Sequence, residues 1–242
     1  MKLQIIRHGD PNYEIDSLTE KGWIEAELLS RKLEKMKIDY CYVSPLGRAK
    51  DTAKATLQKT GWTAEELPWL REFAPRILRP DKEGERSVAW DWLPQDWTKD
   101  ERFYSLTDWT ENEIMQEGGV PEEIYMIQKN FDALLSKHGY EREGHIYKAV
   151  RPNQDTIAFF CHFGLGCVLI AHLLGISPML LWQGTCAAPT SITTINTEER
   201  RRGIASFRMA SYGDVSHLYA AGEEPAFAAR FCECYDNVNE RH

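Results

Sequence analysis

Two short apolar runs of the sequence each end in a histidine. The first run, Leu3 to Ile6, is followed by Arg7 and His8, and the second, Ile157 to Cys161, is followed by His162. An imidazole can act as a nucleophile or carry a proton near neutral pH. A guanidinium is a permanent cation whose planar set of donors matches the oxygens of a phosphate. This combination of residue types predicts an anion site beside a nucleophilic imidazole.

A second arginine is predicted to join this site. Arg48 lies in the first turn of a helix that we expect to begin at Ser44-Pro45, a good N-cap followed by proline at the first helical position. A cation there opposes the helix dipole, so the placement makes sense if the helix end and Arg48 hold an anion together. Nearby arginines would also lower the pKa of His8 and keep its ring neutral near pH 7.

The elements around these residues predict an α/β fold. Apolar periodicity indicates strands over 2–6, 40–43, 156–161, 191–196 and 204–210, and helices over 17–36, 44–60, 121–138 and up to 174. The first helix is expected to open with a capping box of Ser17 and Glu20. In open α/β sheets, ligands bind outside the carboxyl ends of the strands, which is where His8 and His162 are expected to lie.

Composition limits the class of protein. The 242 residues suffice for a sizeable core, and we expect one domain over 1–242 with an inserted segment. A formal net charge of −8 disfavours nucleic acid or an anionic membrane as a partner. The longest apolar run, Cys167 to Ile176, is too short to span a bilayer, and no apolar signal region opens the chain, so we expect a cytoplasmic protein. Cys41, Cys161 and Cys167 are expected to be reduced core residues.

The segment from Phe73 to about Gly119 departs from the regular pattern. It contains aromatic residues scattered among charges, with acidic side chains outnumbering basic ones, and shows little periodicity. We interpret it as an inserted lid, because long irregular segments inside compact domains are usually functional or mobile. An acidic lid closing over the site would repel a second phosphate on a ligand. Its aromatic rings could stack on a flat or apolar leaving group.

Four motifs in this order resemble the histidine phosphatase superfamily, in its phosphoglycerate-mutase-like branch. They are Leu3 to Gly9, Leu18 to Gly22, Ser44 to Ala49 and Phe160 to Gly164. The resemblance covers most of the chain apart from the inserted segment and the C-terminal tail. It implies a three-layer α/β/α sandwich with a mostly parallel central sheet, a phosphohistidine intermediate, a small-molecule phosphate ester as the ligand, and no metal or other cofactor.

The resemblance also implies roles for individual residues. His8 would be the phosphorylated nucleophile, and Arg7, Arg48 and His162 would form the phosphate pocket. A carboxylic acid would protonate the leaving group, and by its position after the third strand this acid is Glu72.

Further candidates for the site are less closely tied to the motifs. Glu14 and Asp10 are rivals for the role of the acid. His217, in a loop expected to return toward the rim, and Phe163, which follows the second histidine, are candidates for contact with the pocket.

The sequence departs from the mutase pattern at several positions. Mutases of this family usually carry Ser or Thr three residues after the nucleophile and Asn six residues after it, where this chain has Pro11 and Glu14. Glu72 is followed by Phe73 and lacks the Glu-Arg-x-Tyr signature of mutases. These departures favour a phosphomonoester hydrolase. A phosphoglycerate-type phosphomutase and a catalytically silent phospho-ligand binder are the alternatives.

A metal hydrolase is an alternative from another class. It could use His8, His162, His217 and Cys161 as ligands. The flanking arginines would repel a cation, and the spacing of these residues is not that of a compact metal site. We therefore expect no metal.

Overall fold

The computed structural model describes residues 1–226, 233–234 and 237–241. At its centre is an 8-stranded sheet with the strand order β5-β4-β10-β1-β11-β12-β9-β8. The strands of this sheet are β1 (Lys2–Arg7), β4 (Tyr40–Val43), β5 (Ala64–Glu66), β8 (Tyr140–Glu143), β9 (Ile146–Ala149), β10 (Thr156–Cys161), β11 (Ile192–Arg201) and β12 (Ile204–Asp214). Short two-stranded ladders outside it are formed by β2 (Pro11–Asn12) with β3 (Ser17–Leu18), β6 (Arg76–Leu78) with β7 (Arg86–Val88), and β13 (Glu233–Cys234) with β14 (Asn237–Arg241).

Only one half of the central sheet is parallel. Strands β1, β10, β4 and β5 pair in parallel, whereas β11, β12, β9 and β8 continue from β1 with antiparallel pairs. The expectation of a mostly parallel sheet is therefore wrong, and the sheet is mixed. The reason is that β11–β12 and β8–β9 are joined by tight turns at Gly203 and Gly144, which have φ of 80° and 61°. Such short connections can join only antiparallel strands.

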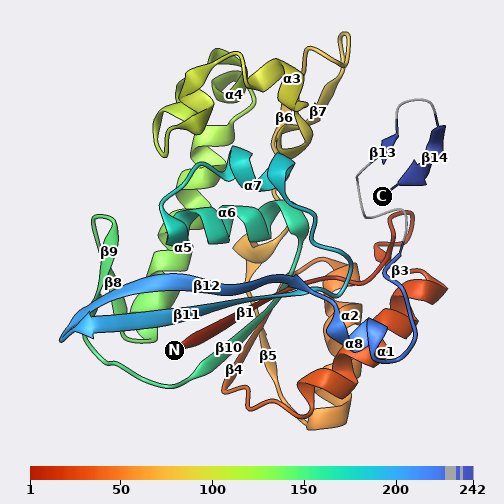
Figure 1. Cartoon of the computed structure of the whole chain (residues 1–242), viewed down its shortest axis with the longest axis vertical. Coiled ribbons are helices and arrows are strands. Elements are labelled where there is room, and N and C mark those ends of the chain that lie inside the picture. Colours follow the sequence, from red (N-terminus) through yellow and green to blue (C-terminus); the bar gives the residue numbers. More distant parts are fainter. Residues whose placement is uncertain (227–232, 235–236, 242) are drawn as a thin grey trace.

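Helices cover both faces of the sheet and give the three layers that were expected (Figure 1). On one face lie α1 (Glu20–Leu33), α2 (Gly47–Thr60) and α8 (Ser216–Tyr219), and on the other lie α5 (Val120–Lys137) and α6 (Phe163–Leu174), with α7 (Pro178–Gly184) packed on α6. Ala158 and Phe160 of β10 pack in the first core, and Ile157 and Phe159 in the second. Because successive side chains of a strand point to opposite faces, an unbroken apolar run such as β10 is buried on both.

The helices α1 and α2 begin later than the sequence predicted. The N-cap of α1 is Thr19, whose Oγ1 accepts the N–H of Gly22 at 3.0 Å, while Ser17 donates to Asp51 at 2.5 Å. Helix α2 begins at Gly47, so Ser44 is not its N-cap. Ser17 makes a tertiary hydrogen bond in place of the predicted local one, and Ser44 makes one in addition to a local bond from the N–H of Leu46.

The inserted segment packs beside α5 and α7, at the top of Figure 1. After η1 (Pro68–Leu70) and the β6–β7 hairpin, it contains η2 (Ala89–Asp91), α3 (Pro94–Trp97), η3 (Glu101–Tyr104), η4 (Asp108–Glu111) and α4 (Glu113–Glu117). Trp92, Trp97 and Trp109 are buried, and they pack edge-on or tilted against Phe103 or Trp182. These tryptophans therefore form a core that attaches the segment to α7, and they are not placed to stack on a ligand.

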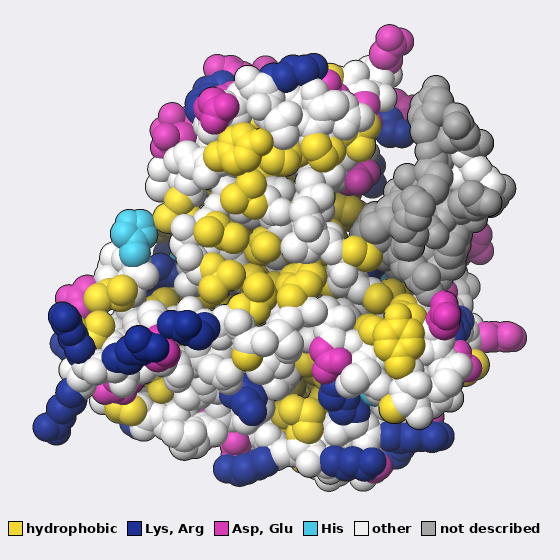
Figure 2. All heavy atoms as spheres, viewed as in Figure 1, with side chains coloured by type: hydrophobic (Ala, Val, Ile, Leu, Met, Phe, Trp, Pro, Cys, Tyr) yellow, Lys and Arg dark blue, Asp and Glu magenta, His cyan; other side chains and the backbone are white. Residues whose placement is uncertain are grey.

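The surface, the cysteines and the lengths of the helices add three observations. Figure 2 shows hydrophobic side chains across the middle of one face, with charged side chains toward its upper and lower margins. Cys41, Cys161 and Cys167 are buried and unbridged, as predicted. Within the described part of the chain, none of the helices has the length and apolar character needed to cross a bilayer.

Candidate active site

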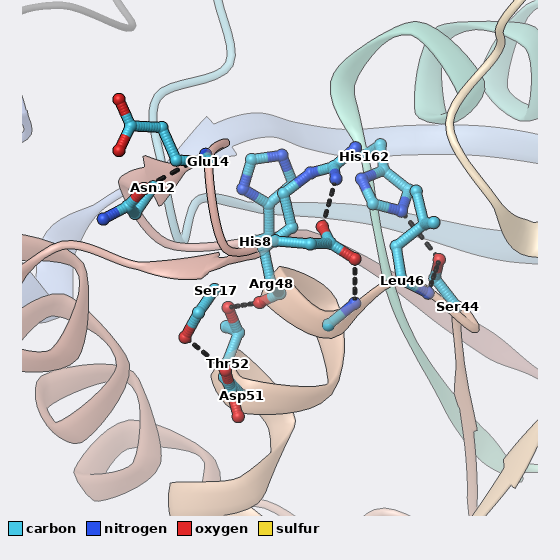
Figure 3. Close-up of polar contacts among 12 residues, drawn as sticks. His8, Asn12, Glu14, Ser17, Ser44, Leu46, Arg48, Asp51, Thr52 and His162 are labelled. Carbon is cyan, nitrogen blue, oxygen red and sulfur yellow. Dashed lines mark hydrogen bonds and ion pairs between the residues drawn. The ribbon is translucent and has the colours of Figure 1, made fainter.

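The carboxyl ends of β1 and β10 bring His8 and His162 together. Arg7 of β1 pairs in register with Cys161 of β10, so the two histidines that follow leave the sheet side by side. Their ring centroids are 5.1 Å apart, with an angle of 58° between the planes (Figure 3). Both side chains are buried. Two histidines that are far apart in the sequence thus share one pocket.

Hydrogen bonding selects the tautomer of His8. Its Nδ1 lies 2.7 Å from the carbonyl oxygen of Gly9. A carbonyl can only accept, so Nδ1 carries the proton and Nε2 carries the lone pair. Burial, and then the positive charges of Arg7 and Arg48, lower the pKa of His8 well below 6.5. The ring is therefore neutral at pH 7, with Nε2 as its nucleophilic atom.

Two buried guanidiniums lie beside the histidines. Arg7 is the last residue of β1, directly before His8, and donates through Nη1 to the carbonyl oxygen of Ala187. Arg48 donates through Nη1 to Oδ1 of Asp16 at 2.5 Å. The Nε of Arg48 is buried and has no hydrogen-bond partner among the described residues. A buried donor without a partner is costly, and an oxyanion in the pocket would satisfy it.

The loop before α1 supports Arg48 through Asp16, which the sequence analysis missed. Asp16 has a φ of 46°, and its Oδ2 accepts the N–H of Gly47 at 2.7 Å. A Cβ on Gly47 would lie 2.1 Å from the carbonyl oxygen of Asp16, so only glycine permits this approach. The Gly47 and Arg48 hydrogen bonds lower the pKa of Asp16 against the opposing effect of burial. The anion at the start of α2 is therefore a carboxylate of the protein itself. This carboxylate binds the N–H of Gly47 and Nη1 of Arg48, and leaves Nε of Arg48 without a partner among the described residues.

His162 is positioned by a hydrogen bond with Ser44, a second residue that the sequence analysis did not assign to the site. Ser44 Oγ lies 2.7 Å from Nε2 of His162 and also accepts the N–H of Leu46 at 3.2 Å (Figure 3). Nδ1 of His162 is buried and makes no hydrogen bond within the described chain. Burial, His8 and the two arginines lower the pKa of His162 well below 6.5, so this ring is also neutral.

The carboxylate of Glu72 lies at the N-terminus of α6, the helix that begins directly after His162. Its Oε1 accepts the N–H of Leu165 at 2.9 Å, and Oε2 lies 3.4 Å from the N–H of Gly164. A Cβ on Gly164 would lie 2.9 Å from Oε1, so the glycine makes room for the carboxylate. Burial raises the pKa of Glu72, although the backbone donors and Arg7 act in the opposite direction. A half-buried carboxyl with a raised pKa has the properties of a proton donor.

The two rival carboxylates are placed differently. Asp10 Oδ2 accepts the hydroxyl of Thr19 at 2.7 Å, and the Asp10 N–H donates to Glu25 at 2.9 Å, which ties this residue to α1. Glu14 is exposed in the turn between β2 and β3, where its N–H donates to Asn12 at 3.1 Å. Neither is held beside His162 as Glu72 is.

Phe163 and His217 also lie near the pocket, in different ways. The ring of Phe163 is buried, and its centroid is 5.5 Å from Cζ of Arg7. His217 is linked to the site through Thr190, whose Oγ1 is 3.0 Å from His217 Nε2 and whose N–H donates to the carbonyl oxygen of His8 at 3.2 Å. Burial, together with Lys32, lowers the pKa of His217 to about 4.

The pocket is therefore lined by fixed cations and neutral imidazoles. Within the described ranges, no three side chains of His, Cys, Asp or Glu are grouped so as to hold a metal ion. An arrangement of two guanidiniums around a neutral imidazole suits a phosphate group, whose oxygens accept from the guanidinium forks.

Comparison with known proteins agrees with this geometry. The family model of the histidine phosphatase superfamily (branch 1) matches residues 3–116, the stretch that contains Arg7, His8, Arg48 and Glu72. This match to the histidine phosphatase superfamily covers just under half of the chain. The remaining pocket residue, His162, lies outside the matched stretch and joins the pocket through the pairing of β1 with β10.

Similar proteins match the chain over nearly its whole length. A probable phosphoglycerate mutase of Erwinia tasmaniensis is 23% identical over 228 residues, which are 90% of this chain and 95% of the relative. A phosphoserine phosphatase of Entamoeba histolytica, solved in complex with phosphoserine, has a TM-score of 0.59 and 19% identity and covers 90% of this chain and 98% of its own. A mycobacterial glucosyl-3-phosphoglycerate phosphatase, solved with VO3, has a TM-score of 0.56 and 18% identity, with coverage of 88% and 98%. At these identities the two solved structures establish the fold alone.

Proposed function

We propose that this protein hydrolyses the monophosphate ester of a small metabolite through a phosphohistidine on His8. The observation that carries the proposal is a neutral, buried imidazole with its lone pair on Nε2, next to the guanidiniums of Arg7 and Arg48. In this role the guanidiniums and His162 bind the oxygens of the transferring group and stabilise their charge in the transition state.

The reaction proceeds in two displacements. In the first, Nε2 of His8 forms a bond to phosphorus while the ester P–O bond breaks, and Glu72 gives its proton to the departing oxygen. In the second, water attacks phosphorus, the P–N bond breaks, Glu72 takes the proton from the water, and inorganic phosphate leaves. The raised pKa of Glu72 supports this role because the first step needs the protonated acid.

A phosphoglycerate mutase is the second candidate, because the relative from Erwinia tasmaniensis carries that name. Hydrolysis is favoured by the residues of the β2–β3 loop. Pro11 has no hydroxyl and Glu14 is an exposed carboxylate, at the positions where mutases of the family usually carry a hydroxyl and an amide. A silent phospho-ligand binder would need the arginines but not the nucleophile, and this chain has both.

The proposal is tested by phosphate release from p-nitrophenyl phosphate and from a panel of phosphorylated metabolites. The wild type should release phosphate, and His8→Ala should retain less than about a hundredth of the rate, because loss of a covalent nucleophile typically costs several orders of magnitude. His145→Ala is the matched control, because His145 is exposed in the β8–β9 turn. Interconversion of 2- and 3-phosphoglycerate faster than phosphate release would instead identify a mutase.

A further inference from the structure

Aromatic rings pack against both arginines of the pocket. The ring of Phe163 lies 5.5 Å from Cζ of Arg7, and the ring of Tyr13 lies 5.4 Å from Cζ of Arg48. Phe163 is buried, but Tyr13 is 69% exposed, at the turn between β2 and β3. A large aromatic side chain that is left in solvent beside a buried cation is unusual unless something else covers its other face. Tyr13 therefore offers a free ring face at the rim of the pocket.

Trp90 is the tryptophan of the inserted segment that reaches the pocket. It is half-buried, whereas Trp92, Trp97 and Trp109 are enclosed. Its indole lies edge-on to Phe163, with 5.9 Å between centroids, and a Cβ added to Gly164 would lie 2.8 Å from Trp90 Cδ1. Gln183 Nε2 donates to the Trp90 carbonyl oxygen at 2.9 Å and fixes the turn that presents the ring. Trp90 thus packs on the same helix end as Glu72, the proposed donor to the leaving group.

The positive charges of the pocket are too few to bind both a phosphate and a second anionic group on the ligand. His8 and His162 are neutral, and Arg48 is already paired with Asp16. A phosphate dianion therefore meets, at most, the two charges of Arg7 and Arg48, with the Asp16 carboxylate beside it.

Three basic residues close in sequence to Arg48 and Glu72 form ion pairs with carboxylates outside the pocket. Lys50 pairs with Glu66 at 2.6 Å, Arg71 pairs with Glu123 at 3.0 Å, and the buried Arg79 is held by Asp81 and Asp91. These three cations are thus paired with carboxylates outside the pocket, so a carboxylate or second phosphate on the ligand gains no ion pair from them.

We propose that the site selects a monophosphate ester whose leaving group is aromatic or apolar and carries no second anionic group, with Tyr13 and Trp90 as the residues that set this preference. This inference rests on the proposed function, since it concerns the leaving-group side of the same pocket. It separates this chain from three of the solved structures that it resembles. Their ligands or substrates, as named, include phosphoserine, 3-phosphoglyceric acid and glucosyl-3-phosphoglycerate.

Two non-hydrolysable phosphonates that differ only at the far end test the preference by calorimetry. The pair is 2-phenylethylphosphonate and 2-carboxyethylphosphonate, and the ratio of their Kd values isolates the end group because the phosphonate is common to both. The wild type should bind the phenyl compound at least about tenfold more tightly, because the ring removes apolar surface from water when it packs on Tyr13 and Trp90. Tyr13→Ala and Trp90→Ala should each reduce the ratio about threefold or more.

Controls separate this inference from the proposed function. Tyr125→Ala, which removes an exposed tyrosine of α5, should leave the ratio unchanged. Trp90→Phe should keep most of the preference and shows that loss in Trp90→Ala is not loss of fold. Equal or tighter binding of the carboxyethyl compound, or a ratio that survives both alanine substitutions, would overturn the inference. Hydrolysis of 2-phenylethyl phosphate is measured in parallel. A binding preference without turnover would count against hydrolysis alone, and turnover without the preference would count against the inference alone.

Discussion

Ser44 Oγ lies 2.7 Å from Nε2 of His162, and the two residues are 118 positions apart in the chain. Both are buried, and the other ring nitrogen of His162 makes no hydrogen bond with the described residues. A neutral imidazole carries one proton, and a phosphoryl oxygen needs a donor. If Ser44 donates its hydroxyl proton to Nε2, the ring proton is on Nδ1 and can be donated to the phosphoryl group.

We therefore expect Ser44→Ala to weaken catalysis without removing any group that touches the substrate. Loss of one buried hydrogen bond that selects a tautomer should lower kcat/KM by about 10- to 100-fold. Ser30→Ala is the matched control, because Ser30 is equally buried but bonds to Glu27 within α1. The nitrogen-15 chemical shifts of His162 provide a readout that is independent of rate. Wild-type protein with the proton on Nε2 would contradict the assignment.

Glu72→Gln should impair esters with poor leaving groups most. General acid catalysis is worth about a hundred- to ten-thousand-fold, so hydrolysis of alkyl phosphates should fall within that range, whereas p-nitrophenyl phosphate should be largely spared. Because the acid must be protonated, the rate on alkyl esters should also decline as the pH rises through the raised pKa of Glu72. Equal losses on both kinds of ester would point away from Glu72 and toward Glu14 or Asp10.

His217 should make the protein less stable in acid. Its folded-state pKa is lowered to about 4 from an ordinary value of 6.5, mainly by burial. Above pH 6.5 the ring is neutral in both states. As the pH falls below 6.5 the unfolded chain binds a proton that the folded chain does not, so the free energy of unfolding drops by about 3 kcal/mol by pH 4.

Urea unfolding of the wild type and His217→Gln at pH 7.5 and pH 4.5 measures this contribution. The variant should lose less stability between the two pH values than the wild type, because glutamine does not titrate. His145→Gln, at an exposed position, should behave like the wild type. An identical pH dependence in His217→Gln and the wild type would show that His217 does not resist protonation in the fold.

The central strands and helices could be predicted because the apolar pattern of each segment is compatible with only one kind of secondary structure. The unbroken apolar run of β10 can be buried on both faces only inside a sheet, and α5 begins and ends within one residue of the predicted 121–138. The meeting of His8 and His162 follows from the same reasoning, since both come directly after buried strands that turn out to be neighbours.

Other features depend on contacts that no local pattern encodes. Ser44 has the N-cap propensity that was assigned to it, but a bond to His162 takes its hydroxyl. The left-handed conformation of Asp16, which lets it bind both Gly47 and Arg48, has no signal in the loop sequence. Strands were predicted over 191–196 and 204–210, but the charged residues between them gave no sign that β11 runs on to Arg201. In the fold these residues are part of the paired strands, with an ion pair between Arg208 and Glu198.

The measurement that tests the central claim most directly is identification of the phosphorylated residue. The wild type is mixed with p-nitrophenyl phosphate and quenched in alkali after milliseconds, and peptides are analysed by mass spectrometry under conditions that preserve phosphohistidine. Phosphorus-31 spectra then distinguish the two ring nitrogens. We predict phosphate on Nε2 of His8, because Nδ1 is occupied by the Gly9 carbonyl, and no phosphoenzyme in His8→Ala. Phosphate on His162, or undiminished turnover in His8→Ala without any phosphoenzyme in the wild type, would contradict the account.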